Sequence, residues 1–215
     1  FIASKYKESA VWANPNDLTM RFTAKRYARF ENFAINHSNI CVANSNATRE
    51  DFLNRYSAPN DWNCEVIHWG VDTEMFLPLR RDDEDDFSLY SEVRSRFNIK
   101  EDSYLLLAVG RLAARKGFGM LLQSFAQVKK ESPNSILVIV GRGQLRSRLL
   151  KQAKRLGLEG SVFIESSMKF DELALLYRVS DIVVYPSYYE GQGLIPLEAM
   201  ASGAPVITVN HGPLP

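Results

Sequence analysis

Short runs of apolar, mostly β-branched residues alternate along the chain with longer amphipathic segments. The short runs have the length and composition of buried strands and fall at residues 40–44, 65–69, 104–109, 135–140, 162–165, 181–186 and 205–209. The longer segments have helical periodicity and fall at residues 23–36, 46–56, 118–131, 143–156, 171–179 and 194–202. Strands and helices that alternate in this order predict an α/β fold, in which parallel sheets carry helices on both faces.

The alternation is interrupted at residues 78–103, which are polar and carry an acidic cluster at Asp82–Asp86. Such a segment is typical of an exposed linker, followed here by a short helix at about 88–97. We therefore expect two Rossmann-like domains. Residues 1–77 form the C-terminal part of a truncated first domain, and residues 78–215 form most of a doubly wound second domain that lacks its C-terminal end. The chain, which starts without Met, has the features of a fragment.

Composition and charge narrow the class of protein. The 215 residues are 46% hydrophobic and 24% charged, as in soluble globular domains, and no apolar run approaches the roughly 20 residues of a transmembrane helix. The net charge of +1 comes from interspersed acidic and basic residues, which argues against a nucleic-acid-binding surface. The only cysteines, Cys41 and Cys64, are too few for a zinc site. We expect a cytoplasmic protein with no metal centre.

The segment Tyr185–Gly203, with the sequence YPSYYEGQGLIPLEAMASG, contains a glycine turn that leads into a helix. Gly191 and Gly193 supply the backbone freedom of a tight turn, and Pro196 suits the first turn of a helix. The helix should therefore start near Leu194. Its free backbone N–H groups and the positive end of its dipole would face the loop, where they can hold an anion such as a diphosphate.

Two carboxylates lie on either side of this turn. Glu190 falls on the loop and Glu198 about one turn inside the helix. One carboxylate can therefore reach a sugar ring while the other reaches a neighbouring part of the same ligand. The alternative is a buried helix, LIPLEAMA, that follows an ordinary surface loop.

A basic loop follows the strand at 104–109. Arg111 and Lys116 fall there, beyond the carboxyl end of a parallel strand, which is where such sheets bind ligands. Arg can bind phosphate oxygens as a planar fork, and Lys supplies a compact charge that stabilises negative charge as it develops. The two cations could hold a diphosphate, and the alternative is a solvated basic loop.

Two other motifs are weaker. Gly141-Arg142-Gly143 suggests a dinucleotide-binding fingerprint, but Arg146 stands where its third glycine is expected, so these glycines more simply let the backbone pass close to a ligand or a neighbouring helix. Asp83-Glu84-Asp85 has the spacing of a metal-binding acidic triplet. It lies in a polar linker with no preceding strand, which favours a solvated charge run.

Taken in order, these motifs resemble the donor-binding half of the retaining family 4 glycosyltransferases of the GT-B fold, the glycosyl transferases group 1. The resemblance covers about residues 25–215, and upstream it includes Val42-Ala43-Asn44-Ser45 and Gly70-Val71-Asp72. It implies transfer of a hexosyl group from a nucleotide diphosphate sugar, such as a UDP or GDP sugar, to an acceptor hydroxyl. It also implies retention of anomeric configuration, independence from metals and other cofactors, and a glycan or lipid-linked acceptor.

The resemblance implies a role for each matching residue. Arg111 and Lys116 would hold the diphosphate and offset the charge that builds on it, Glu198 would accept hydrogen bonds from the ribose, and Glu190 would contact the donor sugar. The remaining donor-binding positions would supply backbone near the phosphates or lie against the base: Gly110, Gly141, Gly143, Ser166, Met168, Gly193, Leu194 and Ile195.

Retention admits two mechanisms, a covalent intermediate on a carboxylate or attack on the face from which the phosphate leaves. The family leans to the second, in which Glu190 is a positioning group and not a nucleophile. Two positions depart from the family pattern: Gln192 replaces an aromatic residue, and His68-Trp69 replaces Pro-Asn. These departures affect the packing of the loop behind Glu190 and the hinge.

Two other functions compete with the transferase. A nucleotide-sugar-binding module without catalysis would not need a group at the sugar face, so the presence of Glu190 favours an enzyme. A sugar phosphorylase would need a cofactor-binding lysine that is not identified. Residues 1–215 alone are expected to bind the nucleotide sugar weakly without turnover, because a GT-B site is completed by closure of two domains. The resemblance also allows peripheral membrane contact at the inner face through the first domain.

Overall fold

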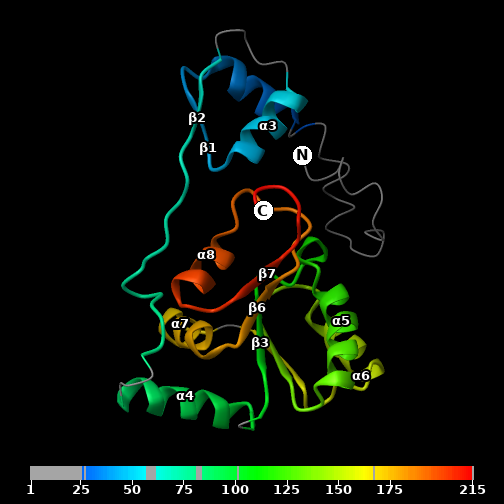
Figure 1. Ribbon diagram of the computed structural model, residues 1–215. Helices are drawn as coiled ribbons and strands as arrows, with labels where there is room; N and C mark the ends of the chain where they lie inside the picture. Colours follow the sequence, from blue (N-terminus) through cyan, green and yellow to red (C-terminus); the bar gives the residue numbers. More distant parts are fainter. Residues whose placement is uncertain are drawn as a thin grey trace. The chain divides into compact units, whose positions relative to one another are not determined.

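The computed structural model describes residues 26, 28–56, 62–80, 84–100, 102–166 and 168–214. The chain divides into two compact units, Phe1–His68 and Trp69–Pro215, and each contains a parallel sheet with helices beside it (Figure 1). The α/β fold class that the sequence predicts is therefore confirmed. None of the helices in these ranges is long and apolar enough to cross a membrane.

The first unit holds a two-stranded sheet. Its elements in chain order are a helix at residues 28–37, β1 (Cys41–Ala43), α3 (Asn46–Arg55) and β2 (Cys64–Val66). α3 begins after Ser45, because the Ser45 hydroxyl accepts a hydrogen bond from the backbone N–H of Thr48 at 3.0 Å and so caps the helix. Both strands are shorter than the apolar runs that predict them.

The second unit holds a five-stranded parallel sheet with the order β5-β4-β3-β6-β7 (Figure 1). Its strands are β3 (Leu105–Val109), β4 (Ile136–Val140), β5 (Val162–Glu165), β6 (Ile182–Tyr185) and β7 (Val206–Thr208). Its helices are α4 (Glu84–Arg96), the 3-10 helix η2 (Ala114–Lys116), α5 (Phe118–Glu131), α6 (Arg146–Arg155), α7 (Phe170–Val179) and α8 (Leu194–Ala201). Each strand predicted between residues 104 and 209 is present, with small differences at its ends.

Helices cover both faces of this sheet. Every residue of β3 and β4 is buried, as in strands that are covered on both sides. Leu105 and Leu107 of β3 pack into the core that contains residues of α4, α7 and α8, whereas Leu106 and Ala108 pack into the core that contains residues of α5 and α6. Because one sheet separates two cores, the unit is doubly wound, as predicted.

The strand order reverses next to β3. The chain runs from β3 outward to β4 and β5, and then crosses back to form β6 and β7 on the other side of β3. In open parallel sheets, ligands bind beyond the carboxyl ends of the strands at such a reversal. The loops that leave β3 at Gly110 and β6 at Pro186 therefore mark the place where a ligand site is expected.

The polar segment at residues 78–103 differs from its prediction as an exposed linker. α4 begins at Glu84, earlier than the helix expected at 88–97, and Asp86 in its first turn is buried. The Asp86 carboxylate pairs with the Arg178 guanidinium of α7 and accepts a hydrogen bond from the backbone N–H of Arg80 at 2.8 Å. The prediction of a solvated acidic cluster is thus wrong at Asp86, because this carboxylate is buried and pairs with Arg178.

The rest of the acidic triplet is exposed where the structure describes it. Glu84 and Asp85 lie on the surface of the first turn of α4, where acidic side chains complement the positive end of the helix dipole. Asp83 lies outside the described residues. Among the residues that are described, no three His, Cys, Asp or Glu side chains form a group that could hold a metal ion.

The boundary between the two units lies at His68–Trp69, whereas the sequence places the domain boundary at residue 77. Residues 69–77 belong to the second unit because Val71 and Phe76 pack into its core. The Phe76 ring meets the Tyr177 ring of α7 edge-on, with 5.8 Å between the ring centroids. The second unit therefore includes the segment that precedes the polar stretch.

Candidate active site

Two loops are joined at the carboxyl ends of β3 and β6. The loop after β3 contains η2, and the loop after β6 runs from Pro186 to Gly193. The backbone N–H of Tyr188 donates a hydrogen bond to the carbonyl oxygen of Arg115 at 2.8 Å. In the other direction, the Arg115 guanidinium donates to the carbonyl oxygen of Tyr189 at 3.1 Å. These bonds hold the side chains of the two loops close together.

An ion pair between Lys116 and Glu190 lies at the centre of this junction, with side chains only 8% and 12% exposed. The Lys116 ammonium also donates a hydrogen bond to the Tyr185 hydroxyl at 2.8 Å. The Glu190 carboxylate accepts a hydrogen bond from the Ser187 hydroxyl at 2.5 Å, and Nη1 of Arg115 lies 3.7 Å from it. We call Arg115, Lys116, Tyr185, Ser187 and Glu190 the Lys116 cluster.

Burial and hydrogen bonding set the charges of the Lys116 cluster. Burial by itself raises the pKa of Glu190, but hydrogen bonds from Lys116, Ser187 and Tyr185 outweigh it and leave the pKa below its ordinary value of 4.5. Burial and the adjacent Glu190 raise the pKa of Tyr185, so its hydroxyl stays protonated. Glu190 is therefore an anion at neutral pH, held by hydrogen bonds and by the charge of Lys116.

Arg111 occupies a different environment from Lys116. It is exposed in the loop after β3, and it makes no ion pair within the part of the chain that the structure describes. The two cations that we expect to bind an anion therefore lie in different settings. Lys116 is already paired with Glu190, whereas Arg111 faces solvent. The loop thus carries three cations, two of which, Arg115 and Lys116, lie near the single carboxylate of Glu190, and this leaves an excess of positive charge for an anionic ligand.

α8 begins beside this charged junction. Gly193 precedes it in the left-handed region, with φ 87° and ψ 73°, and α8 starts at Leu194 as predicted. No side chain among the described residues caps this end, so its first backbone N–H groups are left for a ligand or solvent. A Cβ added at Gly110 would lie 3.8 Å from both Ile195 Cδ1 and Lys116 Cδ, so the first turn of α8 and the loop after β3 are neighbours.

Gly141 and Gly143 allow a close approach of backbone to backbone. A Cβ at Gly141 would lie 1.8 Å from the carbonyl oxygen of Gly110, and a Cβ at Gly143 would lie 2.4 Å from that of Leu112. The sequence suggested that Gly141 and Gly143 lie close to a ligand or a helix. In the structure, the close neighbour of both glycines is the loop after β3. The two glycines hold that loop in place behind the Lys116 cluster.

Glu198 lies on the second turn of α8 and is tied to α7. Its carboxylate accepts a hydrogen bond from the hydroxyl of Tyr177 at 2.9 Å, and Tyr177 is fully buried. Burial raises the pKa of Glu198 above its ordinary value of 4.5, and the hydrogen bond from Tyr177 opposes that shift. The two carboxylates of the site therefore differ, because Glu190 is paired with a cation and Glu198 with a neutral hydroxyl.

Ser166 and Met168 lie apart from this junction. They follow β5, the outer strand of the sheet, and β4 separates β5 from β3, which places them about 10 Å to the side at ordinary strand spacing. Ser166 is exposed, Met168 packs partly against the core, and the intervening Ser167 lies outside the described residues. This position is at the same carboxyl edge as the Lys116 cluster, but no described bond joins the two.

Four polar residues of the site were not predicted from the sequence. Arg115 adjoins the predicted Lys116, and Tyr185 and Ser187 end β6 and begin its loop, so the rule of looking beyond each strand could have found all three. Tyr177 sits at an apolar position of its helix. The periodicity of this helix predicts that Tyr177 packs into the core. No neighbouring residue in the sequence indicates that its hydroxyl reaches Glu198.

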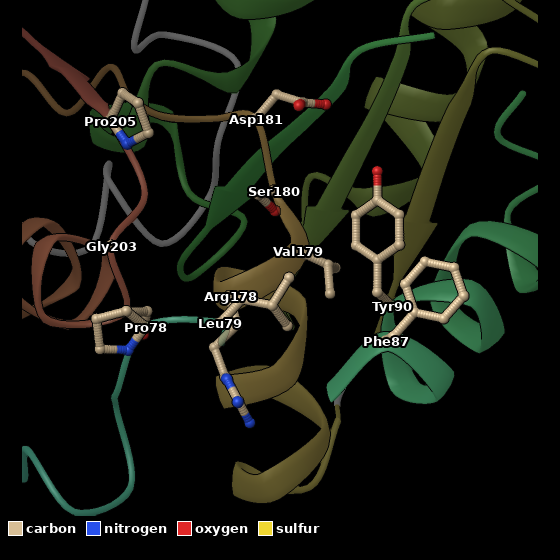
Figure 2. A pocket seen from close by; sticks show the side chains of 11 residues that line it. Pro78, Leu79, Phe87, Tyr90, Arg178, Val179, Ser180, Asp181, Gly203 and Pro205 are labelled. Carbon is tan, nitrogen blue, oxygen red and sulfur yellow. The ribbon is translucent and has the colours of Figure 1, made fainter. Parts of the chain in front are cut away.

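A separate pocket of about 760 Å³ lies at the opposite edge of the sheet (Figure 2). Phe87 and Tyr90 of α4 line one side, and Pro205 precedes β7 on another. The polar groups here already have structural partners, since Arg178 pairs with Asp86. We therefore place the candidate active site at the carboxyl edge, where the charged side chains of the Lys116 cluster meet.

Comparisons with protein families and with curated proteins identify relatives of the chain. The sequence profile of the family described as Glycosyl transferases group 1 matches residues 90–215. An uncharacterised glycosyltransferase of Methanocaldococcus jannaschii is 32% identical over 79% of the chain and 42% of its own length. A D-inositol 3-phosphate glycosyltransferase of Salinispora arenicola is 32% identical over 80% of the chain and 40% of its own length.

A solved structure shows the same fold. The crystal structure of Anabaena HepE in complex with UDP and glucose matches with a TM-score of 0.75 and 23% identity, over 88% of the chain and 49% of HepE. The chain thus spans about two fifths of the length of the curated relatives named above and about half of this solved structure.

Proposed function

Because the chain belongs to the glycosyl transferases group 1 family of GT-B proteins, we propose that it provides the nucleotide-sugar site of a retaining hexosyltransferase. The reaction transfers a hexosyl group from a nucleotide diphosphate sugar to an acceptor hydroxyl of a glycan or a lipid-linked substrate. The binding of UDP and glucose by the structural neighbour HepE supports a UDP sugar as the first candidate. The activity concerns the longer protein, since the relatives are more than twice as long as the matched part.

The Lys116 cluster is the observation that carries the proposal. Lys116, Arg115 and the exposed Arg111 supply positive charge beside the uncapped N-terminus of α8. Cations and helix N-terminal amides stabilise the negative charge that builds on a departing diphosphate. This charge set also supports a reaction that is independent of a metal ion, because the protein itself supplies the positive charge that a metal would.

Glu190 is proposed to hold the sugar and not to attack it. Its carboxylate is engaged by Lys116 and Ser187, and its lowered pKa makes it a weak base. A carboxylate in this state is poorly suited to forming a covalent intermediate. The geometry supports attack on the face from which the phosphate leaves, with the departing phosphate accepting the proton of the acceptor hydroxyl.

Glu198 is proposed to bind the ribose hydroxyls. It lies about one turn into α8, the helix whose first turn neighbours Lys116. The hydrogen bond from Tyr177 occupies one of its oxygens, Oε2, and leaves the other for a ligand. Ser166 and Met168 are proposed to lie against the nucleotide base. Peripheral membrane contact is proposed for the remainder of the longer protein.

Donor binding and turnover of the longer protein test the proposal separately. Thermal-shift measurements with UDP, GDP and ADP sugars should show a rise in melting temperature for one base, because selective binding stabilises the folded state. Product NMR should then show a retained anomeric configuration, with a rate unchanged by EDTA. Binding without any transfer or donor hydrolysis would favour a non-catalytic nucleotide-sugar-binding module.

A substitution at Lys116 tests the observation on which the proposal depends. Lys116→Met should reduce the transfer rate by about a hundred-fold or more, because it removes a charged group that stabilises the leaving diphosphate. Lys154→Met is the matched control, since Lys154 pairs with Glu159 on the surface, where their side chains are 74% and 66% exposed. Equal rates in the two variants would contradict the proposed role of Lys116.

A further inference from the structure

The side chain of Gln192 pairs with the backbone of Trp69. The Trp69 N–H donates a hydrogen bond to Gln192 Oε1 at 2.7 Å, and Gln192 Nε2 donates to the Trp69 carbonyl oxygen at 2.7 Å. One carboxamide thus satisfies both backbone groups of one residue, as a neighbouring strand would. Trp69 is the first residue of the second unit, so this bond pair reaches the point where the chain enters that unit.

Gln192 lies in the most adaptable part of the loop after β6. Gly191 and Gly193 flank it, and glycine leaves a backbone with more conformations than any other residue. Gln192 is the single side chain between Glu190 and the start of α8 that can restrain this stretch. On the other side, Glu190 is restrained by Lys116 and Ser187. The side chains of Glu190 and Gln192, two residues apart, therefore both tie the loop to other parts of the second unit.

The chemistry of the pair depends on the amide. An aromatic side chain at this position, as in the family that the sequence resembles, could not accept from the Trp69 N–H and donate to its carbonyl oxygen together. The backbone N–H and carbonyl of Trp69 lie between β2 and the turn at Asp72–Phe76, and the residue as a whole is 58% exposed. The bond pair therefore belongs to the backbone of Trp69 and not to its ring.

We propose that Gln192 is a positioning residue that couples the sugar-binding carboxylate of Glu190 to the backbone at the entry of the second unit. This inference rests on the proposed function. Loss of the bond pair would let the Gly191–Gly193 stretch sample other conformations, and Glu190 would present its carboxylate to the sugar less often. The diphosphate and ribose contacts of Arg111, Lys116 and Glu198 would persist, so the nucleotide would still bind.

Three variants of the full-length protein test the coupling. Gln192→Met keeps the length of the side chain and removes both hydrogen bonds, and Gln192→Glu keeps the acceptor but loses the donor. Trp69→Ala is the matched control, because it retains both backbone partners. We expect Gln192→Met to lower kcat about ten-fold, the size of effect typical of losing one or two neutral hydrogen bonds, while the Kd for UDP or GDP stays unchanged. Gln192→Glu should fall between Gln192→Met and wild type.

Hydrogen exchange of the Trp69 amide provides a readout that does not depend on activity. It should be about ten-fold faster in Gln192→Met than in wild type or Trp69→Ala. Equal exchange rates in wild type and Gln192→Met would show that the Gln192 side chain does not protect the Trp69 amide, and would contradict the proposed restraint. Faster exchange with unchanged kcat would overturn its coupling to Glu190. If wild type binds and transfers no nucleotide sugar, the proposed function fails, and the exchange rates still decide whether Gln192 restrains Trp69.

Discussion

The hydroxyl of the fully buried Tyr177 donates a hydrogen bond to the carboxylate of Glu198 across 2.9 Å and so joins α7 to α8. The Tyr177 ring also meets Phe76, which anchors the segment that enters the second unit. One tyrosine thus connects the core of the unit to the carboxylate proposed to bind ribose.

Tyr177→Phe should lower the free energy of unfolding by about 2 kcal/mol. The ring packing is kept, but a half-buried carboxylate loses the hydrogen bond of its neutral partner. Urea denaturation of the two proteins measures the difference. Tyr104→Phe is the control, since Tyr104 is 56% exposed and should change the stability by less than about 0.5 kcal/mol. Equal losses in both variants would contradict a specific contribution of the Tyr177 hydroxyl.

Nucleotide binding should weaken on mild acidification through Glu198. Burial raises the pKa of this carboxyl above 4.5, so it takes up a proton at a higher pH than an ordinary Glu and then accepts fewer hydrogen bonds from ribose. Calorimetric Kd values for UDP or GDP between about pH 5 and neutral measure this loss. Glu198→Gln should bind more weakly at neutral pH and lack the same dependence.

The raised pKa of Glu198 also determines how its contribution to protein stability changes with pH. Between the ordinary and the raised pKa the folded state binds more protons than the unfolded state, so the contribution of Glu198 to stability falls as pH rises through that window. The difference in unfolding free energy between wild type and Glu198→Gln should therefore become less favourable to wild type as pH rises from the ordinary value of 4.5 through the raised pKa. An opposite slope would contradict the raised pKa.

Asp86→Asn should destabilise the second unit by about 3 kcal/mol, because it removes the charged partner of Arg178, whose side chain is only 13% exposed. Glu84→Gln, on the exposed first turn of the same helix, should cost less than about 1 kcal/mol. Denaturant unfolding compares the two.

The pH dependence of this pair provides a second check. Chiefly the hydrogen bond from the Arg80 backbone, and also Arg178, lower the pKa of Asp86 below its ordinary value of 3.8. Its stabilisation is therefore complete above that value and is lost as pH falls through the lowered pKa. Asp86→Asn should lack this acid-dependent loss, and a loss of the same size in the variant would refute it.

Gly141→Ala should destabilise the protein by about 3 kcal/mol and weaken nucleotide binding. The added methyl group would lie 1.8 Å from the carbonyl oxygen of Gly110, so the loop that carries Lys116 must shift. Gly70→Ala is the control, because nothing lies within 4 Å of its added methyl group. A melting temperature of Gly141→Ala equal to that of Gly70→Ala would show that the loop yields without cost.

Local sequence patterns correctly predicted the order of the elements, and they pointed to the edge of the sheet where we place the site. Apolar periodicity is local, so the runs at 104–109 and 118–131 correspond closely to β3 and α5. The rule that ligands bind beyond the carboxyl ends of parallel strands placed Lys116 and Glu190 at one edge, and the Gly193 turn marked the start of α8. Each of these features depends on residues that are close in the sequence.

The pairing of polar groups, in contrast, could be read from the folded chain alone. Lys116, and not Arg111, pairs with Glu190 across 74 positions, and Gln192 meets Trp69 across 123. Asp86 in an acidic run is buried because Arg178 of another helix reaches it. Such pairings depend on the packing of loops and helices that are distant in the chain. Burial and distance in the fold, which local patterns do not carry, set the charge and orientation of each group.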